Sequence, residues 1–209
     1  MPKQNLNGDG GLGRRSSKSE GGFTLIEFLI AMAITTVVLG ATVGLAATIQ
    51  QAYNADLDDV AVEQEVRYAL DWVARYVRSA GSNPYSCAVF QPIWLDPNGN
   101  GAYDDVRVQA DINPPDGDCT DSEEDVTIAL DPVARVITLN TGAGAVAMTD
   151  PVITNLQFTY LDSSHNPTAV EAQIAYVGIA VTGRSKGRAN STGFTQFTLS
   201  NEVRIRVRP

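Results

Sequence analysis

The sequence predicts an α+β fold, in which one long N-terminal helix packs on a mainly antiparallel β-sheet. An uncharged run of 22 residues from Phe28 to Ile49 is long enough to cross a bilayer as one helix, which needs about 20 residues. An amphipathic helical pattern continues from this run without a break as far as Gly81. From Val106 onward the hydrophobic period changes to two, which is typical of strands.

We divide the chain into four segments, at residues 1–22, 23–50, 51–81 and 82–209. The first is polar and has no expected fold, the second is an apolar half-helix, the third is an amphipathic half-helix, and the fourth is a β-rich head with acidic loops. Basic residues precede the apolar run and acidic residues follow it. This asymmetry places the N-terminus in the cytoplasm and the head outside the membrane.

The amphipathic half-helix is expected to pack on the head through a stripe of apolar residues. Its members recur mostly at steps of three or four and are Leu57, Val60, Val66, Leu70, Val73, Val77 and Ala80. Gly81 is a typical helix stop, and Pro84 follows three residues later. One continuous helix from about residue 24 to residue 80 would be roughly 85 Å long at 1.5 Å per residue.

Alternating apolar and polar residues predict the strands of the head. The clearest segments are residues 106–110, 126–128 and 158–160. Further candidates are residues 135–140, 173–181, 194–199 and 203–207, with loops expected at 162–167 and 183–193.

Composition excludes several classes of function. The chain has 209 residues and a formal net charge of −9, which argues against nucleic acid as a partner because phosphate binding needs clusters of Lys and Arg. The one histidine, His165, has no thiol or metal-ligand partner at a meaningful spacing. We therefore expect that the protein is not an enzyme.

A short motif lies at the start of the apolar run, where residues 21–27 read GGFTLIE. Glu27 is a lone acid at the edge of a membrane span, which costs a few kcal/mol unless it is paired, and so indicates a functional role. A secretory signal peptide has a shorter apolar region, of about 7–15 residues, with its small-residue cleavage site after that region. Here the apolar run is longer, and the small residues Gly21 and Gly22 come before it.

These features resemble the type IV prepilins, the class that includes pilus subunits and the pseudopilins of type II secretion. The resemblance implies a pilin-like fold, with residues 1–22 as a leader. It also implies that a prepilin peptidase cuts between Gly22 and Phe23, and that the new N-terminus at Phe23 is N-methylated. Glu27 is then expected to pair with the N-terminal amine of a neighbouring subunit.

Three further stretches, at residues 67–81, 153–161 and 200–206, resemble minor pilins of the PilW type. They are less similar to the J-type minor pseudopilins of type II secretion. The resemblance implies a subunit that primes or joins assembly of a type IV pilus. Its expected partners are other pilins, through the N-terminal helix, together with the prepilin peptidase and the inner-membrane assembly platform.

That resemblance also implies a location. Before assembly the protein is expected to span the inner membrane once with its head facing the periplasm, and after assembly to lie in the pilus or at the cell surface. Two alternatives stay open. One is a minor pseudopilin of a type II secretion system, and the other is a single-span, calcium-binding surface protein with an uncleaved N-terminus.

Cys87 and Cys119 both follow the membrane span, and no other cysteine competes with them. Thiols on the outer side of a bacterial membrane are expected to oxidise. The sequence therefore predicts one intramolecular disulfide.

The first acidic loop, residues 96–105, resembles the front of an EF-hand calcium loop, with Gly101 at the sixth position. The oxygen-bearing residues at positions one, three, five and nine are Asp96, Asn98, Asn100 and Asp104. The twelfth position holds Arg107 in place of a bidentate acid, and Asp105 is the candidate substitute.

The second acidic loop, residues 111–124, fits the same pattern if one residue is inserted after Asn113. Its candidate calcium ligands are Asp111, Asn113, Asp116, Asp118 and Glu123. The alternative is that both loops are solvated turns, since Asp, Asn and Gly favour turns in any case. Calcium is the one cofactor that the sequence suggests.

Overall fold

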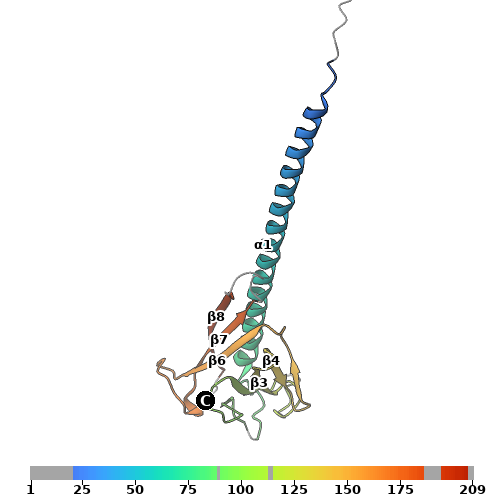
Figure 1. Ribbon diagram of the computed structural model, residues 1–209. Coiled ribbons are helices and arrows are strands. Elements are labelled where there is room, and N and C mark those ends of the chain that lie inside the picture. The colour runs from blue at the N-terminus through green and yellow to red at the C-terminus, as the bar shows by residue number, and fades with distance from the viewer. Residues whose placement is uncertain (1–20, 89, 113–114, 186–193, 207–209) are drawn as a thin grey trace, which may run out of the picture. The chain divides into compact units, whose positions relative to one another are not determined.

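The computed structural model describes residues 21–88, 90–112, 115–185 and 194–206 (Figure 1). The chain divides into two compact units, residues 1–48 and 49–209. Helix α1, Leu25–Ser79, is one continuous α-helix of 55 residues that contributes to both units. The expected long N-terminal helix is thus confirmed.

In the second unit, α1 buries one apolar stripe. The fully or nearly fully buried residues are Val62, Val66, Ala69, Leu70, Trp72, Val73, Ala74 and Val77. Leu57 and Val60, which we expected in this stripe, are 49% and 51% exposed. At 3.6 residues per turn these two side chains point away from the side that holds Val66 and Val73, so the interpretation of their spacing was wrong.

Helix α1 ends where the sequence predicts. Gly81 adopts a φ of 83°, a left-handed conformation that glycine adopts without a steric penalty, and this breaks the helical path. The Gly81 N–H donates to the carbonyl oxygen of Gln109 at 3.1 Å. The end of the helix is therefore tied directly to the sheet that follows.

The first sheet has five strands in the order β1-β2-β3-β4-β5, with every neighbouring pair antiparallel. The strands are β1 Ile93–Leu95, β2 Asp105–Gln109, β3 Asp125–Asp131, β4 Val136–Asn140 and β5 Ala145–Ala147. Val106 and Val108 of β2 point into the core, whereas Arg107 lies on the other face. Strand β2 ends at Gln109, one residue before the predicted end.

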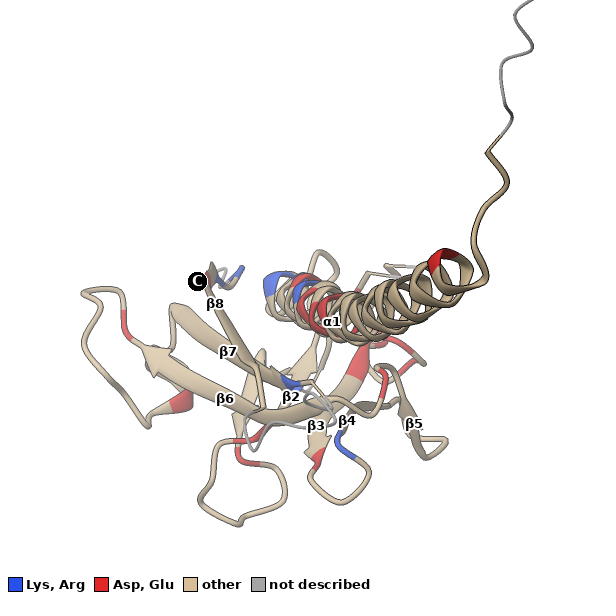
Figure 2. Ribbon diagram, turned by 45° about the horizontal axis from the view of Figure 1, so that its top comes forward, with Lys and Arg blue, Asp and Glu red and all other residues tan. Residues whose placement is uncertain are grey.

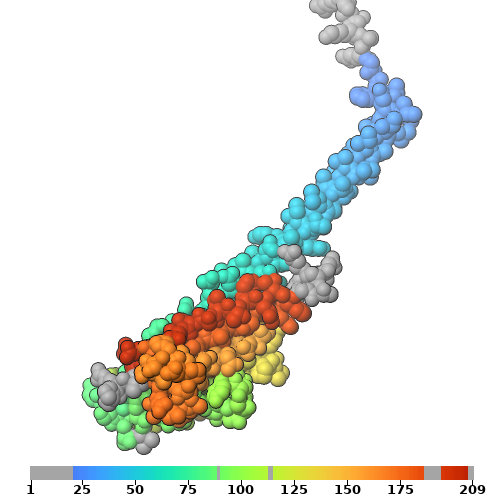
Figure 3. Space-filling view, turned by 90° about the vertical axis from the view of Figure 1, so that its left-hand side faces the viewer, coloured from blue at the N-terminus to red at the C-terminus, as the bar shows by residue number. Residues whose placement is uncertain are grey.

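The second sheet has three antiparallel strands in the order β6-β7-β8. They are β6 Ile153–Leu161, β7 Tyr176–Arg184 and β8 Gln196–Arg204, and a short 3₁₀ helix, η1 Glu171–Gln173, precedes β7. Thr195, just before β8, donates its hydroxyl to Asp59 of α1 at 3.1 Å. Figures 2 and 3 show this sheet beside the part of α1 that belongs to the second unit.

Both sheets and the second half of α1 share one hydrophobic core. The largest buried side chains of the strands include Ile128, Ile137, Leu156, Phe158 and Ile179. This arrangement confirms the α+β class, one long helix packed on antiparallel sheets.

Helix α1 and strand β7 approach one another closely at Gly183. A Cβ atom at this position would lie 2.5 Å from Cγ2 of Val66 and 3.0 Å from Cγ1 of Val62. Residues 183 and 184 were expected in a loop, yet both belong to β7. Glycine is needed here because only a strand without a side chain can approach the helix at this distance.

We expect Gly183→Ala to lower the free energy of unfolding by about 1–3 kcal/mol, because the added methyl group overpacks the contact with Val66. Gly178→Ala is the matched control, because Gly178 lies in the same strand as Gly183. A Cβ at Gly178 would meet Cβ of Thr159 in the neighbouring strand β6 at an ordinary 3.5 Å. Thermal unfolding of both variants checks this. Equal melting temperatures for the two variants would contradict the close approach at Gly183.

Candidate functional site

The processing motif lies at the first turn of α1. Gly22 and Phe23 precede the helix, and Phe23 is 88% exposed. Thr24 occupies the N-cap position, and Glu27 stands three residues later in the first turn. The bond expected to be cut therefore lies in an exposed segment outside the helix.

Thr24 and Glu27 cap the helix reciprocally. The backbone N–H and the hydroxyl of Thr24 both donate to Oε2 of Glu27 at 2.9 Å, and the Glu27 N–H donates to Oγ1 of Thr24 at 3.3 Å. This is a capping box, which satisfies backbone donors that a helix start leaves free. The negative charge of Glu27 also lies at the positive end of the helix dipole. Glu27 thus has a local structural role, whatever else it does.

The α1 surface that follows is apolar and unburied. Every large apolar side chain from Leu25 to Ile49 is at least 53% exposed, and an 18-residue window of the helix has a mean hydropathy of 2.2. The four threonine hydroxyls in this stretch each donate to a carbonyl of their own helix, as Thr35 does to Ala31 at 2.7 Å. By length and composition this helix can cross a membrane.

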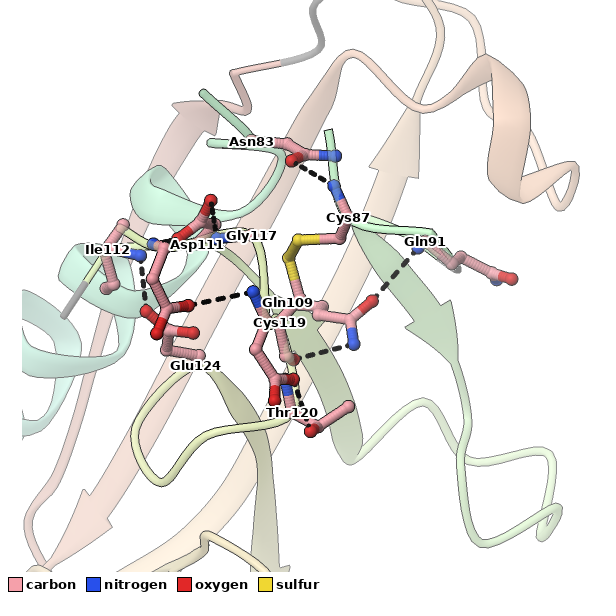
Figure 4. The surroundings of a disulfide bond; sticks show 12 residues. Asn83, Cys87, Gln91, Gln109, Asp111, Ile112, Gly117, Cys119, Thr120 and Glu124 are labelled. Carbon is pink, nitrogen blue, oxygen red and sulfur yellow. Dashed lines mark hydrogen bonds between the residues drawn. A yellow bond between two sulfur atoms is a disulfide. The ribbon is translucent and has the colours of Figure 1, made fainter. Parts of the chain in front are cut away.

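The disulfide predicted from the sequence is present. Cys87 and Cys119 are bonded, with their Cα atoms 6.0 Å apart. Gln109 at the end of β2 lies beside the bridge, where its Nε2 donates to the carbonyl oxygen of Cys119 at 2.9 Å and its Oε1 accepts from the Gln91 N–H (Figure 4). The bridge therefore joins the segment after α1 to the second acidic loop.

The first acidic loop turns around Asp96. Its two carboxylate oxygens accept the N–H groups of Asn100 at 3.1 Å and of Gly101 at 2.6 Å. Gly101 has a φ of 76°, as the sixth position of an EF-hand loop requires. The Asp104 carboxylate accepts from the Asn100 side-chain amide at 3.1 Å. Hydrogen bonds within the loop thus connect Asp96, Asn100 and Asp104.

Asp105 differs from the other acids of this loop because it is buried, with 2% of its surface exposed. Its Oδ2 accepts the Asn98 N–H at 2.9 Å, whereas Oδ1 has no hydrogen-bond partner among the described residues. Burial raises the pKa of Asp105 to about 6, and the charges of Asp96 and Asp104 add to that rise. Asp105 is therefore buried without full compensation.

A tyrosine missed by the sequence reasoning lies beside this carboxylate. The Tyr160 hydroxyl is buried without a hydrogen-bond partner among the described residues. Burial raises its pKa, and the negative charge of Asp105 is the next cause. Its ring packs edge-on against Tyr103, at 5.9 Å between centroids. The strand pattern of residues 158–160 indicated that Tyr160 faces inward, but gave no sign of the acid beside it.

The second acidic loop is also organised around an aspartate. The two oxygens of Asp111 accept the N–H groups of Asp116 at 2.9 Å and of Gly117 at 3.2 Å. Hydrogen bonds from the Thr120 side chain and backbone hold the pKa of Asp118 below its usual value. Asn113 lies outside the described residues. The buried acid near the end of this loop is Glu124, which follows the expected ligand Glu123 in sequence. Its Oε1 accepts the Ile112 N–H at 2.6 Å.

No ready-made metal centre is found in the described ranges, where no three His, Cys, Asp or Glu side chains converge. The histidine at position 165 lies in a turn, with Nε2 at 3.2 Å from Oε1 of Glu202 and its ring stacked on Tyr176. The side chains of His165 and Glu202 are both exposed, so this is a contact at the protein surface.

Comparison with known proteins gives one match. Residues 17–43 match the prokaryotic N-terminal methylation motif. No curated protein and no solved structure matches the chain. The matched segment contains the expected cleavage point, Glu27 and the first part of the apolar helix. It supports a prepilin-like protein, a prepilin peptidase substrate of the type IV pilin or pseudopilin kind, and with the apolar helix it fits a membrane-anchored pilin.

Proposed function

We propose that this protein is a minor pilin of the PilW type, which joins or primes a type IV pilus after prepilin peptidase has removed residues 1–22. The observation that carries the proposal is the exposed apolar half of α1, the first part of which lies within the matched methylation motif. An apolar helix surface of this size needs either lipid or other apolar helices around it. A pilin meets lipid first and neighbouring subunits later.

Cleavage would place a new amine next to the capping box. The amine of Phe23 stands one residue before Thr24, and N-methylation leaves it able to carry a positive charge. Within an apolar helix bundle, an ammonium and a carboxylate offset one another only when they meet. We propose that Glu27 of one subunit meets the Phe23 amine of its neighbour during assembly.

The proposed topology follows from the charges around the span. Residues 1–22 carry a net charge of +2, and their removal takes the formal charge of the chain from −9 to −11. We propose that the basic N-terminus lies in the cytoplasm and the acidic head in the periplasm, and that assembly carries the head to the cell surface. The partners are other pilins and the inner-membrane assembly platform, and the role is structural, with no catalytic step.

Mass spectrometry of the N-terminal peptide tests the processing step. We expect the mature chain to begin at Phe23 and to carry one N-methyl group. A native chain that begins at Met1, or one cut after residue 49, would contradict the prepilin assignment and favour a single-span surface protein.

A separate test distinguishes a subunit of a type IV pilus from a subunit of a type II secretion system. We expect the protein to be present in pili sheared from the cell, and its deletion to reduce the number of pili while secretion continues. Loss of secretion with normal pili would favour the alternative of a minor pseudopilin, because the matched motif is compatible with both classes.

A further inference from the structure

The carboxylate of Asp105 is buried without a compensating charge. It is 2% exposed, one oxygen accepts the Asn98 N–H at 2.9 Å, and Oδ1 has no hydrogen-bond partner among the described residues. Burial of an ionised carboxylate is costly unless it is paired or fully hydrogen-bonded. Such a group in a folded protein indicates that something else completes its surroundings.

The basic residue nearest in sequence does not supply this charge. Arg107 donates from Nε to Oδ1 of Asp125 at 2.6 Å, and its guanidinium lies 4.4 Å from the centre of the Trp94 ring. Residues 96–105 contain three acids and no basic residue. Among the described ion pairs, none includes an acid of this loop. No basic side chain of the described residues therefore supplies a compensating charge to this loop.

We propose that the loop of residues 96–105 binds one calcium ion, with the carboxylates of Asp96 and Asp105 as its charged ligands. The two residues are the first and the last of the loop. The Asp96 carboxylate accepts the N–H groups of Asn100 and Gly101, and the Asp105 carboxylate accepts the Asn98 N–H. The buried Tyr160 hydroxyl is a second unpartnered oxygen near this carboxylate.

The donor atoms select the kind of ion. The loop offers carboxylate, amide and backbone oxygens and no sulfur or imidazole nitrogen, which suits a hard cation. Calcium accepts six to eight such oxygens, water included, in flexible geometry, whereas magnesium demands a near-ideal octahedron. Since no three acidic side chains converge in the described structure, neutral oxygens must supply the remaining ligands.

The same observations predict weak binding. Arg107 occupies the position where an EF-hand loop carries its bidentate acid, and Arg107 is engaged with Asp125. We therefore expect a dissociation constant in the range of extracellular calcium modules, about 0.1–1 mM. The second acidic loop is similar in that both oxygens of Asp111 accept backbone N–H groups, as those of Asp96 do, so variants in each loop are needed to locate the ion.

Thermal unfolding of the full processed chain in detergent micelles tests the site, with tryptophan fluorescence as a reporter of the head, which contains both Trp72 and Trp94. With 10 mM calcium chloride the melting temperature should rise by roughly 3–10 °C over that in chelator, as expected for a ligand at about 10–100 times its dissociation constant. An equal concentration of magnesium should give a much smaller rise.

Two variants and one control locate the ion. Asp105→Asn keeps the shape but removes the charge, so it should be at least as stable as the wild type in chelator and should lose the calcium response. Asp96→Asn should lose the response as well, and it serves as the second variant if Asp105→Asn does not fold. Asp116→Asn in the second loop is the control and should keep the full response.

Each outcome decides the proposal. A calcium response that disappears in Asp105→Asn and Asp96→Asn but persists in Asp116→Asn supports it. A melting temperature indifferent to calcium and chelator overturns it, and so does an equal rise with magnesium. Loss of the response in Asp116→Asn alone would move the site to the second loop and would also overturn it.

Discussion

Replacement of Glu27 by alanine is expected to leave the protein in the membrane but to reduce its incorporation into pili at least about tenfold. The variant makes the span more apolar, so membrane insertion should be unaffected. In an assembled bundle, however, it would leave the Phe23 amine of a neighbour without its carboxylate, and an unpaired buried charge costs about 3–5 kcal/mol. Immunoblots of sheared pili and of the membrane fraction measure both quantities.

The capping box makes this experiment sharper, because Glu27 also stabilises the first turn of α1. Glu27→Gln removes the charge but keeps a side chain that can complete a capping box. Thr24→Ala removes the capping hydroxyl but keeps the carboxylate. If the charge matters for assembly, Glu27→Gln should fail like Glu27→Ala, and Thr24→Ala should assemble nearly as well as the wild type.

The opposite pattern has a clear meaning. Normal incorporation of Glu27→Gln with poor incorporation of Thr24→Ala would show that Glu27 acts by capping the helix, and that the proposed pairing with the Phe23 amine is wrong. Reduced membrane levels of Glu27→Ala would show that the variant is degraded before it reaches the assembly step. Comparison of the two fractions separates these cases.

The sequence predicts the long helix well, because its signals are local. Gly81 stops α1 by its own backbone conformation, and the uncharged run sets the apolar half by composition alone. The capping box is also visible in the sequence, as a threonine followed three residues later by glutamate, although these two residues were interpreted only as parts of the processing motif. Such features need no knowledge of the tertiary fold.

The strands are harder to predict, because their partners decide them. Strand β8 runs unbroken from Gln196 to Arg204, although the polar run of residues 200–202 had indicated two separate strands. Pairing with β7 along the whole length overrides this low β propensity. Strands β1 and β5 were missed, since three residues are too few to establish a period.

The acidic loops show the same limit at a candidate site. Their composition and spacing pointed to calcium in both loops alike. The difference between them depends on tertiary packing. Phe158 of β6 donates its N–H to the carbonyl oxygen of Tyr103 at 2.9 Å, which fixes the first loop against the second sheet beside the buried Asp105. No sequence pattern indicates which of several neighbouring acids becomes buried in this way.

Removal of the disulfide is expected to give the largest loss of stability. The bridge joins residues that are 32 apart in sequence, and the loop-entropy relation gives about 3–4 kcal/mol for a closed loop of this length. The Cys87→Ala/Cys119→Ala double variant should therefore melt roughly 6–16 °C below the wild type. Alanine is preferred to serine because Cys119 is buried, and a hydroxyl there would need a partner of its own.

Reductant supplies the matched control for this measurement. Wild-type protein melted with dithiothreitol should approach the double variant, whereas the double variant should be indifferent to the reagent. Thiol labelling of wild-type protein unfolded without reductant should find no free cysteine. Two labelled cysteines under those conditions would show that the bridge does not form in the cell, and equal melting temperatures for the oxidised wild type and the double variant would show that it does not stabilise the head.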